Sequence, residues 1–97
     1  MDETAVRDKA QAHGDATVAG DLRTAGADLT KEAMAQAGGV MAKMPKPLTA
    51  AEIRDVTSDG DAFLARIAYL GEDSEAIVVS RWEERDGRPK IVDLAVE

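Results

Sequence analysis

Three turn signals divide the second half of the chain into four runs of alternating hydrophobicity. Asp59-Gly60 and Asp86-Gly87 are each flanked by apolar runs, and Gly71-Glu72-Asp73-Ser74 lies between them. Asp-Gly is typical of two-residue β-hairpin loops because both central residues take a positive φ, which glycine adopts freely and aspartate tolerates. The runs are rich in Ile, Val, Leu and aromatic residues. The pattern therefore predicts a four-stranded antiparallel meander over residues 51–97.

The register of two-residue loops divides the strand residues between two faces. One face is almost entirely aliphatic and carries Ile53, Leu64, Arg66, Ala68, Leu70, Ile77, Val79, Arg81, Val92, Leu94 and Val96. The other holds all three aromatic residues and carries Arg54, Val56, Phe63, Ala65, Ile67, Tyr69, Val78, Ser80, Trp82, Ile91, Asp93 and Ala95. Neither face is plainly polar, although an antiparallel sheet with one solvated face normally alternates apolar and polar residues. We therefore expect helices to cover one face and a second copy of the protein to cover the other.

The chain before the meander carries helix signals. Apolar and small residues recur at helical spacing from residue 2 onward. We expect a first helix over residues 2–13 with Gly14 as its C-cap. A second helix is expected from Asp15, which would be its N-cap, to about Ala25.

A third helix is expected to begin at Thr30, because Leu29 and Met34 occupy the positions of a hydrophobic staple around it. Two prolines end this helix, and residues 45–50 then form an extended connector. The start of the sheet is ambiguous, since Thr49 to Glu52 matches a capping box. We favour a strand there because the first hairpin needs a partner.

Length and composition limit the class of protein. With 97 residues we expect one domain over residues 1–97, with helices in 1–45, a connector in 45–50 and the sheet in 51–97. The absence of cysteine excludes disulfides and cysteine-based zinc sites, and it fits a cytoplasmic location. The net charge of -7 argues against nucleic-acid and anionic-membrane partners. No run is long and apolar enough to span a bilayer.

The expected order of three helices and a four-stranded meander is that of a cystatin-like α+β cone. Several short segments punctuate this order, namely His13-Gly14-Asp15, Asp28-Leu29-Thr30, Ser58-Asp59-Gly60-Asp61-Ala62, Trp82, Asp86-Gly87-Arg88 and Ile91. In these segments the chain resembles the NTF2-like superfamily, including its SnoaL-like proteins. The resemblance implies a curved sheet around a helix-lined pocket and homodimers packed through the outer sheet face. Members include ketosteroid isomerases, polyketide cyclases, epoxide hydrolases and dehydratases as well as non-catalytic binding proteins, so the fold does not select a function.

The chain also departs from that superfamily. Its helical part is shorter than usual, which implies a small or partly filled pocket. Ketosteroid isomerases carry an acid at an inward position of a strand before the last turn, and the matching residue here is Val79, counted back from Gly87. We therefore do not transfer the isomerase activity. The same count puts the aliphatic face under the helices.

Two arginines lie on that aliphatic face. Arg66 and Arg81 are on adjacent strands in diagonal positions, within reach of a shared partner. A buried arginine is costly unless it is paired, so one interpretation is a clamp for an anionic ligand. The pocket lining would then include Val79, Leu94 and Met41. The alternative is that both arginines reach the rim or pair with acids of the helices.

The remaining candidates are one histidine and the second face of the sheet. His13 ends the first expected helix near the pocket mouth, where it would act as an acid or base or would interact with the helix dipole. On the second face we expect a polar-aromatic dimer patch made of Trp82, Phe63, Tyr69 and Ser80. If the two faces are reversed, Asp93 and Tyr69 line the pocket and Asp93 becomes an acid-base candidate.

We favour a small dimeric protein that binds a hydrophobic or anionic small molecule in a mainly aliphatic pocket, or that serves as an accessory domain. The alternative is a SnoaL-like isomerase, cyclase or hydrolase that uses His13 or Asp93 as its acid-base group. A third hypothesis is a dimerisation module whose cone is filled by Met and Leu side chains. Since one histidine and scattered acids have no metal-ligand spacing, we expect no metal and no cofactor.

Overall fold

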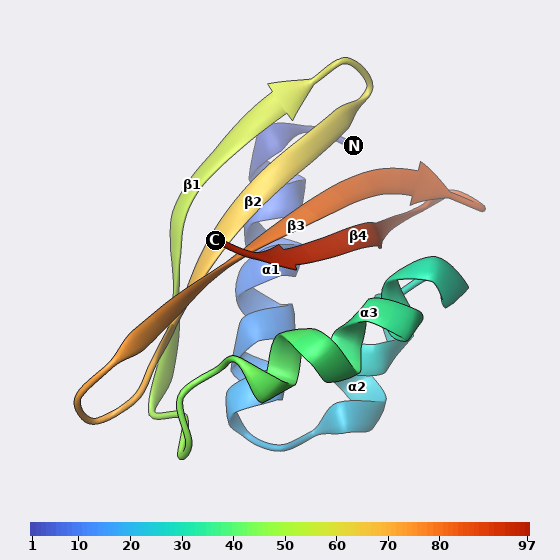
Figure 1. Ribbon diagram of the computed structural model, residues 1–97. Helices are drawn as coiled ribbons and strands as arrows, with labels where there is room; N and C mark the ends of the chain where they lie inside the picture. Colours follow the sequence, from blue (N-terminus) through green and yellow to red (C-terminus); the bar gives the residue numbers. More distant parts are fainter.

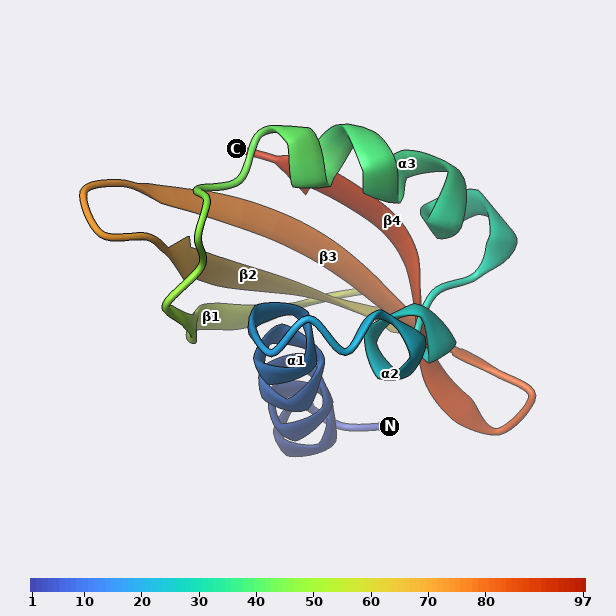
Figure 2. The same ribbon diagram turned by 90° about the horizontal axis from the view of Figure 1, so that it is seen from below.

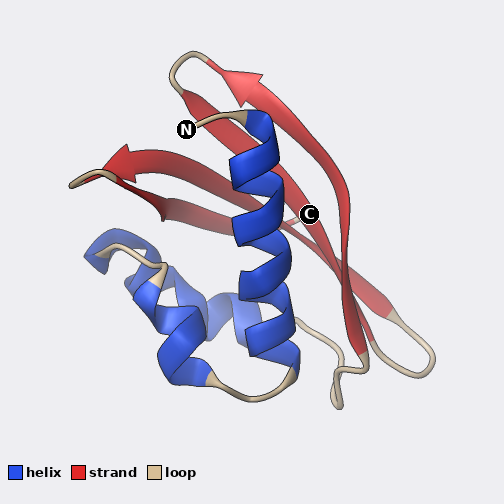
Figure 3. Cartoon of the chain, turned by 180° about the vertical axis from the view of Figure 1, so that it is seen from behind, coloured by secondary structure: helices blue, strands red, loops and turns tan.

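The computed structural model describes residues 1–97, and in it three helices precede a four-stranded antiparallel sheet of order β1-β2-β3-β4 (Figure 1). The elements are α1 (Glu3–Val18), α2 (Leu22–Ala27), α3 (Lys31–Ala42), β1 (Ala50–Asp59), β2 (Ala62–Leu70), β3 (Glu75–Arg85) and β4 (Arg88–Val96). Figure 3 shows the helices gathered on one side of the curved sheet. The predicted α+β order and the meander are confirmed. None of the helices is long and apolar enough to cross a membrane.

Turn chemistry sets the hairpins. In the β3–β4 hairpin Asp86 and Gly87 are the two loop residues, with φ of 55° and 79°, as the Asp-Gly signal predicts. In the β1–β2 hairpin Asp59 already pairs with Ala62, so the loop begins one residue later than expected. Gly60 then occupies the first loop position, with φ of 64°. A glycine at that position is typical of the other common two-residue hairpin turn.

Two register shifts change which face some residues occupy. One lies in β1, and in the β3–β4 pairing the partner jumps from Asp93 to Ile91, which leaves Val92 as an extra residue. An extra residue in one strand reverses the inward and outward sense of the residues beyond it. As a result, the face of the aromatic side chains gains Ile53, Leu94 and Val96, and the opposite face gains Asp93.

The helices cover the face that carries the aromatic residues. Trp82, Ile67, Val78 and Ser80 on this face are at most 2% exposed. The apolar residues among them pack in one core with Val6 and Ala10 of α1, among others. The expectation that the aliphatic face lies under the helices was therefore wrong.

Helix α1 is longer than predicted and passes through Gly14. This glycine is buried against β1, and a Cβ built on it would lie 2.8 Å from Cβ of Ala51. Gly14 therefore permits a close helix-strand contact and is not a C-cap. The helix instead ends at Val18 with Ala19 as its C-cap, before Gly20 with φ of 77°, and Asp21 is the N-cap of α2.

The segment between α2 and α3 is attached to the edge of the sheet. The Ile91 amide donates to the Asp28 carbonyl at 2.7 Å, and the Thr30 amide donates to the Ile91 carbonyl at 3.0 Å. Thr30 also caps α3, as predicted, because its hydroxyl accepts from the Ala33 amide at 3.3 Å. These bonds hold Asp28 in a defined position beside α1.

Candidate functional site

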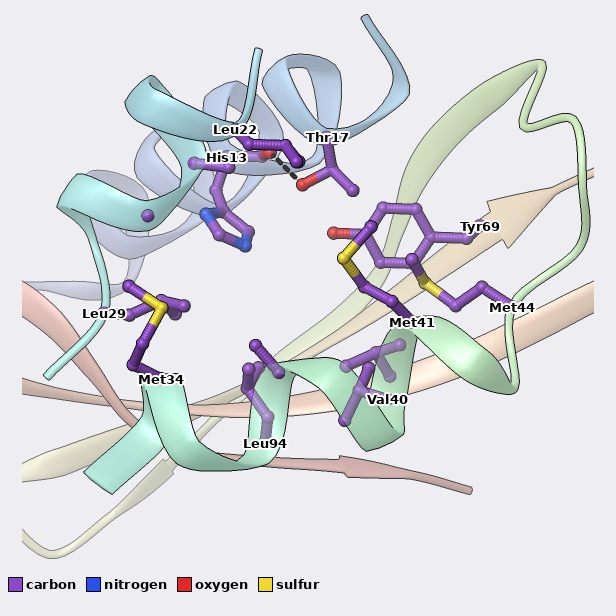
Figure 4. Close-up of a pocket in the computed structure, with 14 residues that line it drawn as sticks. His13, Thr17, Leu22, Leu29, Met34, Val40, Met41, Met44, Tyr69 and Leu94 are labelled. Atoms are coloured by element: carbon purple, nitrogen blue, oxygen red, sulfur yellow. Dashed lines mark hydrogen bonds between the residues drawn. The ribbon is translucent and has the colours of Figure 1, made fainter. Parts of the chain in front are cut away.

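A pocket of about 180 Å³ opens between α3 on one side and α1 with α2 on the other (Figure 4). Its floor is the concave face of the sheet, and eleven of its fourteen lining residues are apolar. The lining consists of His13, Thr17, Leu22, Ala25, Gly26, Leu29, Met34, Ala37, Val40, Met41, Met44, Tyr69, Val78 and Leu94. The cone is therefore not filled by the Met and Leu side chains.

The pocket residue His13 is hydrogen-bonded to a carboxylate behind the pocket wall. Nδ1 of His13 lies 3.2 Å from Oδ2 of Asp28, and Nζ of Lys9 lies 3.0 Å from Oδ1 of the same carboxylate. Burial by itself would raise the pKa of Asp28, but the hydrogen bonds and charges of His13 and Lys9 outweigh it and hold that pKa below its usual value. An ionised carboxylate only accepts hydrogen bonds, so Nδ1 of His13 is the donor.

This hydrogen bond orients the imidazole. The ring of His13 projects from α1 into the pocket, and Figure 4 shows its second nitrogen facing the interior. The ring also meets the indole of Trp82 edge-on, with centroids 6.3 Å apart. With Nδ1 bonded to Asp28, Nε2 is the ring nitrogen left to interact with a molecule in the pocket.

Comparisons with known proteins bear on this architecture. No protein-family model matches the chain, and no curated protein matches its sequence. Among solved structures, an NTF2-like protein of unknown function from Burkholderia xenovorans matches 98% of this chain and 83% of its own, with a TM-score of 0.64 and 19% identity. The chain has the NTF2-like fold. The match is one of fold alone, so the chemistry of the site has to be read from this chain's own residues.

Tyr69 supplies the second polar group in the pocket. Its side chain comes from β2, and Figure 4 shows its hydroxyl facing the same interior as His13. Burial raises the pKa of the Tyr69 phenol, a hydrogen bond with Thr17 acts in the opposite direction, and the charge of Asp15 raises it further. Tyr69 is therefore a neutral phenol at physiological pH. Thr17 itself donates to the His13 carbonyl at 2.9 Å.

The two predicted ligand-binding arginines lie on the outer face of the sheet. Arg66 pairs with Glu97 and with Asp55 at 2.8 Å, and the hydrogen bonds that it donates to these acids raise its pKa above its usual value. Arg81 pairs with Asp59 at 2.5 Å and with Glu83 at 3.1 Å. The expectation of an arginine clamp in the pocket was therefore wrong.

The other predicted pocket residues divide between the two faces. Val79 pairs across the sheet with Arg66, so it lies on the outer face and outside the pocket. Met41 and Leu94 do line the pocket. Leu94 does so because of the shift at Val92, and not because the aliphatic face is covered.

The expected dimer patch is part of the core of the chain itself. The Trp82 indole donates to the Ser80 hydroxyl at 2.9 Å, which donates to the Ala65 carbonyl at 3.1 Å. Phe63 pairs with Trp82 on the same face and packs against this core, as Tyr69 does. These four predicted interface residues therefore do not lie on the outer face.

Asp93 is exposed and lies away from the pocket. Its carboxylate accepts from the Gln36 side chain of α3 at 2.7 Å, while the oxygen of the same amide accepts from the Leu94 backbone at 2.8 Å. Gln36 thus caps the edge of β4, and Asp93 helps to hold α3. The hypothesis of Asp93 as a pocket acid depended on a register that the shift at Val92 changes.

Sequence reasoning missed Asp28 as the partner of His13 and Thr17 as a lining residue. His13 and Thr17 are four residues apart, which is the spacing of neighbours on one helix face. The expected helix break at Gly14 concealed that relation. Asp28 is distant in sequence, and its place follows from the attachment of its backbone to Ile91. No group of three or more His, Asp or Glu side chains is arranged to hold a metal ion.

Proposed function

We propose that this protein binds a small, largely apolar molecule in the pocket between α3 and the pair α1 and α2. The observation that carries the proposal is an open apolar cavity with a few convergent polar groups at one end, His13, Thr17 and Tyr69. Such a combination is typical of small-molecule sites.

The pocket favours a ligand with the bulk of one or two rings. Its volume of about 180 Å³ is slightly larger than that of an apolar protein cavity of roughly 150 Å³ that binds benzene. A hydroxyl or carbonyl oxygen on the ligand would interact with His13 and the Tyr69 phenol. A carboxylate is disfavoured because no lysine or arginine lines the pocket.

Flexible apolar side chains form the entrance. Leu22 of α2 and Met34 and Met41 of α3 line the pocket while remaining more than one third exposed. Methionine has three rotatable bonds and adapts to irregular shapes, which suits a mouth through which a ligand passes.

The experiment is an NMR titration of the labelled protein with benzene and with phenol. Shifts should concentrate at Val40, Val78 and Leu94, and phenol should bind several-fold more tightly through one added hydrogen bond. The variant Ala37→Phe places a ring in the pocket and should weaken the binding of both probes at least tenfold. Its control is Ala35→Phe, which adds the same ring to an exposed position of α3 outside the lining.

Two results would overturn the binding proposal. One is that neither probe shifts the pocket residues at concentrations where each is soluble. The other is that Ala35→Phe weakens binding as much as Ala37→Phe does, since the effect would then not arise in the pocket.

A second candidate function is acid-base catalysis by His13, which the bond to Asp28 supports. An imidazole oriented by a carboxylate, with its other nitrogen toward an apolar cavity, is a common arrangement for a general base. The neutral Tyr69 phenol is a hydrogen-bond donor for an oxygen that gains negative charge. This pair suits removal of a proton next to a carbonyl group.

Deuterium exchange tests this candidate. Cyclohexenone in D2O should exchange its α-protons faster with the protein than without it, and His13→Gln should lower the added rate by a factor of about 100 or more. Tyr69→Phe should lower it less than His13→Gln. A wild-type rate equal to that of buffer, with phenol still binding, would reject catalysis and leave binding in place.

We also propose a homodimer formed through the outer face of the sheet. In this register that face carries Leu64, Leu70, Ile77 and Val79, all partly exposed in one chain. The ion-paired side chains of Arg66 and Arg81 lie among these residues, directly across from Val79 and Leu64 on the neighbouring strands. Arginine is enriched in protein interfaces, so its presence among exposed apolar residues is compatible with a contact surface.

A further inference from the structure

A second cleft lies on the far side of α2 from the apolar pocket. It has a volume of about 310 Å³ and is lined by Lys9, Arg23, Thr24, Ala27, Asp28, Arg88, Pro89 and Lys90. These residues come from α1, from α2 and the residue after it, and from the start of β4 (Figure 2). The backbone bonds of Ile91 attach the end of α2 to β4, and the pairing of Lys9 with Asp28 connects α1 to them. The apolar pocket and this cleft share no lining residue.

The charge of the cleft opposes that of the whole chain. Four of its eight lining residues are cations and one is a carboxylate, although the chain has a net charge of -7. The carboxylate, Asp28, is already bonded to Lys9 and His13. The cleft is thus a local positive region on an acidic protein, and such a region concentrates small anions.

The two arginines of the cleft form no salt bridge. Five of the seven arginines in the chain form salt bridges, and the two that do not, Arg23 and Arg88, both line this cleft. With nineteen acidic residues against twelve basic ones, acidic partners are plentiful elsewhere. The free guanidinium groups are therefore confined to one place.

The two lysines of the cleft are held in position. Lys9 is fixed by its pairing with Asp28 at 3.0 Å, and the Lys90 ammonium donates to the Ala27 carbonyl. Asp28 offsets one of the four positive charges, and the carbonyl that Lys90 contacts is neutral, so the cleft keeps an excess of positive charge. An incoming anion would meet two positioned ammonium groups and two guanidinium groups without an acidic partner.

We propose that this cleft binds a small doubly charged oxyanion, namely phosphate or a phosphomonoester. A guanidinium group offers parallel N–H donors that match the oxygens of a phosphate, and charge-assisted bonds of this kind are strong. A small anion responds to the local charge, whereas an extended polyanion would also meet the acidic remainder of the surface. The site does not depend on the proposed apolar ligand.

The test is an NMR titration with inorganic phosphate and with glycerol 3-phosphate at low ionic strength. Amide shifts should concentrate at residues 23–28 and 88–90. The variant Arg23→Gln/Arg88→Gln should weaken binding at least about tenfold, because each lost charge-assisted bond is worth roughly a factor of ten. The control is Lys43→Gln/Lys46→Gln, which removes two exposed charges outside the cleft and should leave the affinity within about twofold.

Three outcomes would overturn the proposal. The first is an absence of saturable shifts at residues 23–28 and 88–90 with both probes. The second is an equal loss of affinity in the two double variants, which would indicate a general charge effect. The third is binding to duplex DNA or to vesicles of phosphatidic acid without binding of either small probe. None of these outcomes affects the phenol titration, so the two proposals fail separately.

Discussion

The imidazole of His13 is bonded to the carboxylate of Asp28, which lies fifteen residues later in the chain. The first residue comes from α1, and the second follows α2 and is fixed to β4 through its backbone. The pair therefore joins three elements of the fold. It also determines which nitrogen of His13 faces the pocket.

Asp28→Asn should lower the stability of the protein at neutral pH and make that stability less dependent on pH in the acidic range. The folded state holds the pKa of Asp28 below its usual value, so the ionised carboxylate stabilises the fold at neutral pH. That stabilisation is lost as the pH falls below about 4 and through the lowered pKa. We expect a loss of about 1–2 kcal/mol at pH 7, reduced by partial solvent access, and a smaller difference from wild type at pH 3.

Urea denaturation at several pH values measures both effects. Asp8→Asn is the matched control, because Asp8 is an exposed acid of α1 that forms no salt bridge. A deficit of Asp28→Asn that stays constant from pH 7 to pH 3 would contradict the prediction.

Gly14→Ala should destabilise the protein although alanine is the better helix former. The new Cβ would lie 2.8 Å from that of Ala51, so α1 must shift away from β1. Overpacking of this kind typically costs about 1–3 kcal/mol, which exceeds the gain in helix propensity. In a double-mutant cycle, Ala51→Gly should recover part of the loss. Strictly additive effects in thermal unfolding would show that the two residues are not in contact.

Gly38→Ala should have the opposite effect. Gly38 lies in α3 with nothing within 4 Å of the position of a Cβ, so the added methyl meets no neighbour. Removing a helical glycine stabilises by about 0.5–1 kcal/mol, and the melting temperature should rise. A lower melting temperature would mean that α3 needs its glycines, for example for opening the pocket.

Val79→Lys should convert the proposed dimer to a monomer. Val79 lies on the outer face directly across from Arg66, so a lysine there would be desolvated in the interface beside a like charge. Sedimentation velocity measures the change. Ala12→Lys on the exposed side of α1 is the control with the same charge and should sediment as wild type. A wild-type protein that is already monomeric, or a Val79→Lys dimer, would contradict the interface.

Local sequence signals determined much of the fold. Asp86-Gly87 specified its hairpin and Thr30 specified the start of α3, since turn geometry and caps depend on a few consecutive residues. The α+β order followed from the change of period between the two halves of the chain. The sequence also indicates His13, Met41 and Leu94 as candidate site residues, and all three line the pocket.

Tertiary structure decided which face of the sheet is covered. Both faces are apolar enough to be buried, so their composition could not separate them. Two features separate the faces. Helix α1 approaches the sheet closely at Gly14, which needs small residues opposite it, and the register shift at Val92 puts Leu94 on the covered face and Asp93 on the outer face. Both are contacts between residues far apart in the chain. For the same physical reason the pairing of His13 with Asp28 and the gathering of Arg23 and Arg88 into one cleft appear only in the folded protein.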